Sequence, residues 1–265
     1  PGERVDPAQV WSFIAGHERF RLWGEPMPPA PLWSADRVAI EEVVHGFLTA
    51  YARARGKPEA RFWVEHSPDS ALRHVAFERL FGESFLVHIR RDGRAVAASL
   101  LTVDFGPNDI FKAAEYWLRH LAVSDLAVAA AGPRGLNVRY EDLVEDPRAT
   151  LAPILARLDL DFRPVMLAGD GLKLSRYQDR THALIGSGVQ AARAERWRTT
   201  LTAREVEIFE HIVGDTLSYL GYVSATAAPR RRPRAGERRW HALRAEFRRR
   251  LNKHRQQRRR RQLEG

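Results

Sequence analysis

The sequence predicts an α/β fold in three layers, with a mainly parallel central sheet between helices and a basic helix at the end of the chain. Two segments, residues 61–81 and 85–101, each combine a short apolar strand, a tight turn and a helix. A third apolar strand, residues 136–140, follows a long helical segment. Strands that alternate with helices pair in parallel, and ligands bind at the carboxyl ends of such strands.

Residues 1–60 predict two helices joined by a proline-rich loop. The first is expected from Pro7 to about Glu18, because proline suits the first turn of a helix. The second is expected from Ser34 to Gly56, with serine as its cap and glycine at its end. The string RFWVE at residues 61–65 then predicts a short buried strand.

The stretch 85–101, FLVHIRRDGRAVAASLL, is the most informative part of the chain. Its apolar start predicts a buried strand, and Asp92 can cap the helix that follows. Arg90, Arg91 and Arg94 crowd the turn, where the first backbone N–H groups of the helix lie unpaired. Such a turn can bind a phosphate group. The alternative is that these arginines are solvated or paired with acids.

Composition narrows the class of protein. The chain has 265 residues, 44% of them hydrophobic, which suffices for a sizeable core. It has no cysteine, so disulfides and thiolate metal sites are excluded. We find no apolar run that could span a membrane and no signal peptide. We therefore expect a cytoplasmic protein, with peripheral association with a membrane as the alternative. The first residue is Pro1, which suggests a processed or clipped product.

The formal charge of +10 is unevenly distributed. We predict a domain of residues 1–228 and a tail of residues 229–265, which holds 15 arginines and one lysine against three glutamates. An amphipathic helix of this kind binds a polyanion or an anionic membrane surface, or else it is a solvated tail without a specific partner. We predict no specific nucleic acid. The apolar residues of the tail recur at helical spacing: Trp240, Leu243, Phe247 and Leu251.

The string RDGRAVAASL resembles the 3′-phosphate-binding segment of sulfotransferases. That segment usually reads R, then D or N, then P or G, then R-x-V-x-x-S. The resemblance implies that Arg91 and Ser99 hold the 3′-phosphate of 3′-phosphoadenosine 5′-phosphosulfate (PAPS). It also implies a fold related to that of the P-loop proteins.

A second string, VRYEDLVEDPRATLAPILARL, is similar to a later segment of the same family. The family tyrosine contacts the adenine, and here it is Tyr140. A tyrosine at a strand end is otherwise an ordinary packing residue, so both interpretations stay open. For Glu141 and Asp142 we prefer capping and ion pairing to acid–base catalysis.

The resemblance, which covers residues 61–222, implies further site residues. Around Arg196 the family layout of a basic residue, Trp and L-T recurs, and Thr181 stands where the tyrosylprotein type has a serine. These two residues would assist at the phosphosulfate. His66 replaces a lysine that faces the sulfate, and it could equally bond to the turn backbone. Glu3 stands where a G-E string carries the base in the tyrosylprotein type.

One family feature is missing from the sequence. We find no 5′-phosphosulfate loop, which would combine a basic residue with a glycine and hydroxyl residues after the first strand. The resemblance implies transfer of a sulfuryl group from PAPS to a small-molecule, glycan or peptide acceptor through a hydroxyl or amine, without a metal. Because the loop and its strand are missing, we expect this chain to bind the nucleotide weakly and to show no sulfuryl transfer above background. The alternatives are a non-catalytic adenine-nucleotide-binding relative and a polyanion or membrane-surface binder acting through the tail.

Overall fold

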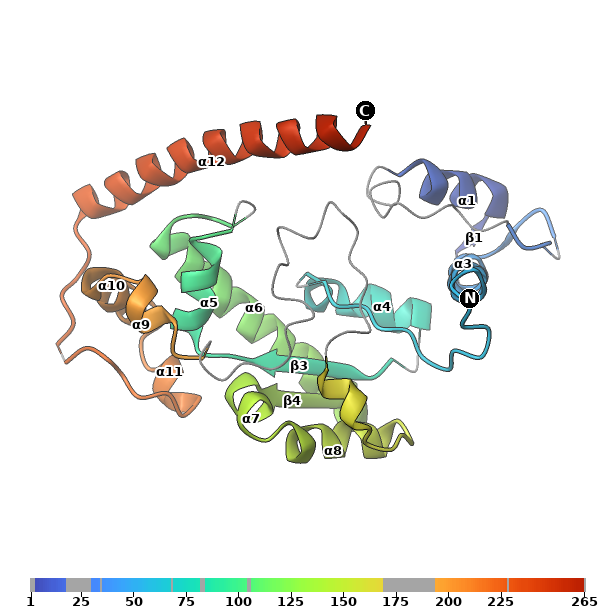
Figure 1. Cartoon of the computed structure of the whole chain (residues 1–265), viewed down its shortest axis with the longest axis horizontal. Coiled ribbons are helices and arrows are strands. Elements are labelled where there is room, and N and C mark those ends of the chain that lie inside the picture. Colours follow the sequence, from blue (N-terminus) through green and yellow to red (C-terminus); the bar gives the residue numbers. More distant parts are fainter. Residues whose placement is uncertain are drawn as a thin grey trace. The chain divides into compact units, whose positions relative to one another are not determined.

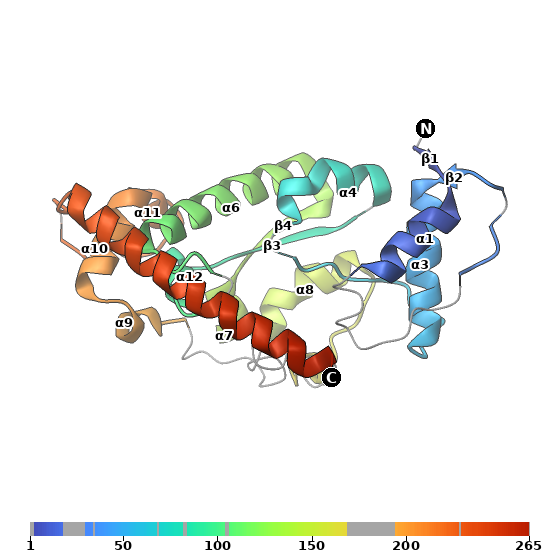
Figure 2. The ribbon, with the colours of Figure 1, turned by 90° about the horizontal axis from the view of Figure 1, so that it is seen from above.

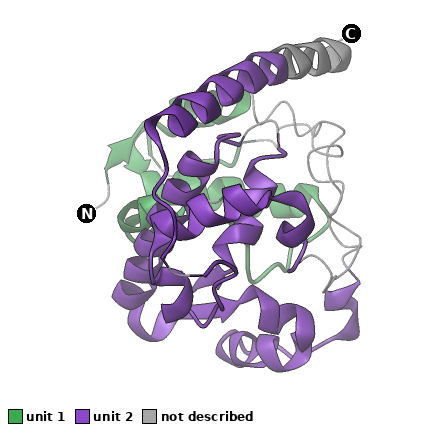
Figure 3. Ribbon diagram, turned by 90° about the vertical axis from the view of Figure 1, so that its left-hand side faces the viewer, with its two compact units in different colours: residues 1–85, 174–177 green, residues 86–173, 178–265 purple. Residues whose placement is uncertain are grey.

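The computed structural model divides the chain into two compact units (Figure 3). Unit 1 comprises the described residues up to Phe85, and unit 2 comprises those from Leu86 onward. The structure describes residues 3–17, 30–33, 35–67, 69–81, 84–103, 106–168, 194–227 and 229–264.

Unit 1 begins with a short strand and a helix. Strand β1 (Arg4–Val5) pairs antiparallel with β2 (Val38–Ala39). Helix α1 (Pro7–Gly16) starts where the sequence predicts. The Asp6 carboxylate accepts the backbone N–H of Ala8 at 2.9 Å, and proline occupies the first turn.

Three further helical segments complete unit 1. The predicted start at Ser34 lies outside the described residues, and α3 (Ile40–Ala54) begins directly after β2. Its end agrees with the prediction, since Gly56 has a φ of +69°, a conformation that glycine adopts without strain. A 3₁₀ turn (Ala71–Arg73) then leads into α4 (His74–Phe81).

The prediction of a buried strand at residues 61–65 is wrong. This segment is exposed and has no regular structure. A buried strand needs a neighbour to satisfy its backbone groups, and none of the described strands pairs with it. The ring of Trp63 instead rests on Phe81 at 4.7 Å, and the Glu65 carboxylate accepts the backbone N–H of Ser67 at 2.8 Å.

The sheet of unit 2 confirms the α/β class. Strand β3 (Leu86–Arg90) runs parallel to β4 (Gly135–Arg139), and α6 (Ile110–Ala131) lies between them in the chain (Figure 1). Figure 2 shows α6 along one side of this strand pair and α7 (Tyr140–Glu145) with α8 (Pro147–Arg157) on the other. The layers are those predicted, but the sheet in the described residues has two parallel strands.

Three helices form the core of unit 2. Helices α5 (Gly93–Leu100) and α10 (Ala203–Val213) both pack against α6. Trp117 of α6 lies 5.8 Å from Phe209 of α10, and both are almost fully buried. The large ring area buried here stabilises the end of the unit that holds the turn after β3.

The helical segment at the end of the domain is divided into more helices than predicted. Helix α9 (Trp197–Thr200) precedes α10, and Thr202 caps α10 by exchanging hydrogen bonds with Glu205. A single helix to about Leu220 was expected, but Gly214 interrupts it with a φ of +57°. The short helix α11 (Thr216–Tyr219) follows.

The basic tail forms one helix, α12 (Ala235–Glu264). Its first half contacts α6, and the Arg204 guanidinium of α10 donates to both oxygens of Glu237 at 2.8 Å. The Arg231 backbone N–H also donates to Glu207 at 2.9 Å. Whether residues 1–228 fold without the tail stays a prediction. Within the described part of the chain, we find no helix that is both long and apolar enough to cross a membrane.

Candidate functional site

Helix α5 begins at the carboxyl end of β3 in a tightly packed turn. The Asp92 carboxylate accepts the backbone N–H of Arg94 at 2.8 Å, so Asp92 is the predicted cap. A glycine follows at position 93, where a Cβ would come within 2.6 Å of the rings of Trp117 and Phe209. The backbone of the turn therefore lies directly on the aromatic core.

Arg94 is a structural residue. It is 2% exposed, and its guanidinium donates to Asp92 at 2.7 Å and to Glu210 at 2.8 Å. The same guanidinium lies 4.1 Å from the centre of the Trp197 ring. Burial alone would lower the pKa of Arg94, but the bonds to both carboxylates outweigh it and raise that pKa. Arg94 thus links α5 to α10.

Arg90 is also paired with an acid. Its Nε donates to Asp125 of α6 at 3.0 Å, and His88 Nδ1 lies 2.9 Å from the same carboxylate oxygen. Burial lowers the pKa of His88, against the opposing effect of Asp125. Pairing with acids, the alternative drawn from the sequence, is therefore confirmed for Arg90 and Arg94.

The Arg91 side chain lies beside an aromatic ring. Its guanidinium carbon lies 4.2 Å from the centre of the Tyr140 ring, which is a cation–π contact. Its backbone carbonyl accepts the indole N–H of Trp117 at 3.2 Å. The parallel register pairs Arg90 with Arg139, so the next residue of each strand lies at the same edge. Two residues that the family resemblance assigns to one ligand are therefore in contact.

Glu141 closes the turn from the β4 side. Its carboxylate accepts the backbone N–H of Asp92 at 3.1 Å and the hydroxyl of Tyr222 at 2.8 Å. Burial and the bond to Glu141 raise the pKa of Tyr222. The Arg139 guanidinium lies 3.6 Å from Glu141 and 3.9 Å from Asp142. Ion pairing is confirmed for both acids, and Glu141 also accepts the backbone N–H of the α5 cap residue, whereas capping by Asp142 stays a prediction.

Two other predicted residues lie on elements next to this turn. Ser99 is exposed in the last turn of α5, about two helical turns after Arg91. Arg196 is exposed at the start of α9, a helix that packs against α5. Its backbone carbonyl accepts the hydroxyl of Thr200 at 2.9 Å. Their contacts with a phosphate stay predictions.

The remaining predicted residues belong to unit 1 or lie outside the described residues. Glu3 and His66 are exposed residues of unit 1. The Glu3 carbonyl accepts the backbone N–H of Ile40 at 3.0 Å, which extends the β1–β2 pairing. Thr181 lies outside the described residues. The proposed roles of these three residues therefore stay predictions.

The cluster of Arg91, Tyr140 and the start of α5 suits a phosphorylated planar ligand. A guanidinium binds phosphate oxygens, and an aromatic face packs on a base. The nearby acids do not oppose an anion strongly, because Asp92 is bonded to Arg94 and Glu141 accepts two hydrogen bonds. Within the described ranges, no three His, Asp or Glu side chains are grouped so as to hold a metal ion.

Glu210 is the residue that the sequence argument missed. It is fully buried, and its carboxylate accepts bonds from Arg94 at 2.8 Å and from the backbone N–H of Ala225 at 2.8 Å. Arg94 and Glu210 are 116 positions apart, so spacing gave no indication of the pair. One signal was present: Glu210 lies four positions after Val206 and three before Val213, on the apolar face of α10.

Comparisons with known proteins place the chain in a family. Residues 17–164 match the family model described as "Sulfotransferase family". The chain is 37% identical over 214 residues to "Nodulation protein NoeE" of Sinorhizobium fredii (strain NBRC 101917 / NGR234), covering 71% of this chain and 50% of that protein. It thus spans about half the length of this curated relative.

A solved structure also resembles the chain. It is a sulfotransferase domain from the curacin biosynthetic pathway, with a TM-score of 0.48 and 20% sequence identity. The match covers 71% of this chain and 69% of that domain.

Proposed function

Because the chain belongs to the sulfotransferase family, we propose that it binds PAPS and transfers the sulfuryl group to a hydroxyl or amine acceptor. The observation that carries this proposal is the contact between Arg91 and Tyr140. The family resemblance assigns these two residues, one after each parallel strand, to the 3′-phosphate and the adenine of one nucleotide. Their meeting at one sheet edge supports a common ligand.

Each residue of the cluster has a distinct physical role in the proposed site. Arg91 supplies a fixed positive charge for the 3′-phosphate from the turn after β3, and Ser99 supplies a hydroxyl donor from the last turn of α5. Tyr140 offers a ring face to the adenine. Arg196 and Thr181 are proposed to assist at the phosphosulfate, as the family resemblance implies. When bound, PAPS supplies a sulfuryl group activated by its link to a phosphate, and fixed cationic donors stabilise the phosphate that departs.

A second candidate is a protein that binds the nucleotide without transferring the sulfuryl group. It is favoured by one observation: no 5′-phosphosulfate string occurs in the 265 residues. Both candidates share the Arg91–Tyr140 site, so donor binding and transfer need separate measurements.

The proposal is tested by binding and by transfer. Adenosine 3′,5′-bisphosphate (PAP) at a hundredfold excess over its Kd is expected to raise the Tm by about 5–10 °C. Transfer is followed with sulfur-labelled PAPS and a panel of hydroxyl and amine acceptors. Labelled product supports the sulfotransferase activity of this chain. Binding without product supports the second candidate, and no response to PAP would overturn both.

A further inference from the structure

Helix α12 is part of unit 2 and packs along one side against the rest of that unit. His241 and Ala245 are buried, and the His241 ring lies edge-on to Phe111 of α6 at 5.6 Å. The Arg248 guanidinium donates to the backbone carbonyl of Leu101 at 3.1 Å. The docked side is therefore formed by a histidine, an alanine and an arginine rather than by the large apolar residues of the helix.

The large apolar residues of α12 point elsewhere. At about 100° per residue, the centre of their stripe lies roughly 120° around the helix from the docked side. Burial in the domain therefore does not explain why these positions are apolar. The residues of this apolar stripe, with their exposed fractions, are Trp240 at 55%, Leu243 at 72%, Phe247 at 65% and Leu251 at 44%.

Exposed arginines border the apolar stripe on both sides. Helical spacing places Arg244 along one border and Arg239 with Arg250 along the other, and all three are exposed. The Arg244 guanidinium lies 5.1 Å from the Trp240 ring. Arginines thus flank the apolar stripe on both sides, and one of them, Arg250, pairs with Glu246 at 3.1 Å. Residues 229–265 hold only three acids.

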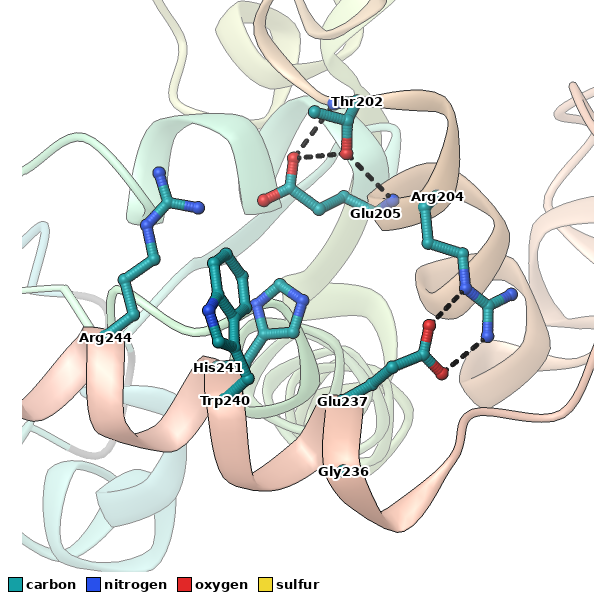
Figure 4. A pocket seen from close by; sticks show the side chains of 8 residues that line it. All are labelled: Thr202, Arg204, Glu205, Gly236, Glu237, Trp240, His241 and Arg244. Atoms are coloured by element: carbon teal, nitrogen blue, oxygen red, sulfur yellow. Dashed lines mark hydrogen bonds and ion pairs between the residues drawn. The ribbon is translucent and has the colours of Figure 1, made fainter.

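The amino-terminal end of the apolar stripe is open. An open cavity of about 370 Å³ lies between α10 and α12 (Figure 4). Trp240 and Arg244 line it from α12, and Thr202 and Glu205 line it from the first turn of α10. The Trp240 and His241 rings are perpendicular, with their centres 4.8 Å apart. An amphipathic aromatic ring beside a cation is typical of a bilayer interface.

We propose that α12 binds an anionic lipid surface, with the apolar stripe in the acyl-chain boundary and the arginines on the headgroups. A helix of this composition lies in the plane of the interface and does not span the bilayer. A lipid surface accounts for both features, because the arginines meet anionic headgroups and the stripe leaves water. A nucleic acid would use the arginines and leave the four apolar side chains in water.

The contacts on the docked side of α12 favour a flat lipid surface over a protein partner that encloses the helix. His241, Ala245 and Arg248 already contact the rest of unit 2, so a protein that encloses the whole helix would have to displace those contacts. A flat surface needs only the outward sector. A bilayer therefore fits the geometry without any rearrangement of unit 2.

The test is vesicle sedimentation of the full chain. One set of vesicles contains phosphatidylcholine alone, and the other mixes three parts of it with one part of phosphatidylglycerol. Leu243→Glu/Phe247→Glu changes the apolar stripe. Val75→Glu/Leu126→Glu is the matched control, because these residues are similarly exposed, at 74% and 70%, and the charge change is identical.

We expect the native chain to bind the anionic vesicles at least about tenfold more tightly than the neutral ones. The stripe variant should bind them at least about tenfold more weakly, and the control within about twofold of the native chain. The Tm of each variant checks its fold. If the stripe variant does not fold, Trp240→Ala supplies a smaller change with the same expected direction.

Three outcomes would overturn the proposal. Equal binding of the stripe variant and the native chain would mean that arginine charge alone suffices. Binding of the native chain to heparin or RNA but not to vesicles would assign the tail to soluble polyanions. Self-association that is lost in the stripe variant, without vesicle binding, would assign the stripe to a second copy of the chain.

Discussion

The guanidinium carbon of Arg91 lies 4.2 Å from the centre of the Tyr140 ring, although the residues are 49 positions apart. They meet because Arg90 and Arg139 are register partners in a parallel strand pair. The first residue beyond each strand then occupies the same edge of the sheet. The site is thus a direct product of the register.

The buried link between Arg94 and Glu210 should dominate the stability of unit 2. We expect Arg94→Leu to lower the free energy of unfolding by about 3–5 kcal/mol, because it leaves buried carboxylates without their cation. Urea denaturation measures the loss. The control is Arg53→Leu, an exposed position where the change should stay within about 0.5 kcal/mol. A loss below about 1 kcal/mol for Arg94→Leu would contradict the assigned role.

The same link predicts a dependence of stability on pH. Burial acts to raise the pKa of Glu210, but the bonds from Thr226, Ala225, Ser224 and Arg94 outweigh it, so the pKa lies below 4.5. A carboxylate with a lowered folded pKa contributes stability above its unfolded pKa, and this stability is lost as the pH falls through the folded pKa.

The stability difference between the native chain and Glu210→Gln should therefore shrink as the pH falls below about 4.5. Urea titrations between pH 7 and pH 3 measure it, with Glu59→Gln as the exposed control. A difference that stays constant over this range would contradict the assignment.

Gly93 is predicted to tolerate no side chain. In Gly93→Ala the new methyl would lie 2.6 Å from Trp117 and Phe209, two buried rings that cannot move freely. We expect a loss of about 1–3 kcal/mol in the free energy of unfolding and weaker PAP binding, because Trp117 also holds the Arg91 carbonyl. Gly16→Ala is the control, since nothing lies within 4 Å of its Cβ. Equal stabilities of the two variants would disprove the close approach.

Removal of the tail should lower the thermal stability of the protein but leave its affinity for the nucleotide nearly unchanged. Deletion of residues 230–265 removes the Arg204–Glu237 and Arg231–Glu207 pairs and the docked side of α12, so the Tm should fall. The Kd for PAP should stay within about threefold, because the Arg91–Tyr140 contact draws on none of these residues. Deletion of residues 254–265 alone keeps every contact named here and is the control. A drop of more than about tenfold in PAP affinity would refute the separation.

Local chemistry made much of the fold predictable. Asp6, Asp92 and Thr202 each cap a helix, and the turn after β3 is encoded within ten residues. The strand predicted at residues 61–65 failed because an apolar run does not reveal whether a neighbouring strand is available to pair with it.

The candidate site was predictable only in part. Arg91 and Tyr140 could be identified from short strings, yet their contact depends on the register of two strands, which those strings do not contain. The pairing of Arg94 with Glu210 is equally non-local. Three neighbouring arginines therefore looked alike in the sequence. In the structure Arg90 and Arg94 form ion pairs with carboxylates, and Arg91 contacts the Tyr140 ring.

Calorimetric titration with PAP and with adenosine 5′-phosphate tests the central claim most directly. Arg91→Ala should lose a charge-assisted contact of about 1.5–3 kcal/mol, or ten- to a hundredfold in affinity for PAP. Its affinity for adenosine 5′-phosphate should change by less than about threefold. Arg90→Ala removes the same charge one residue away and should affect neither ligand strongly. Equal losses for the two nucleotides in Arg91→Ala, or equal losses of PAP affinity in the two variants, would contradict a 3′-phosphate site at Arg91.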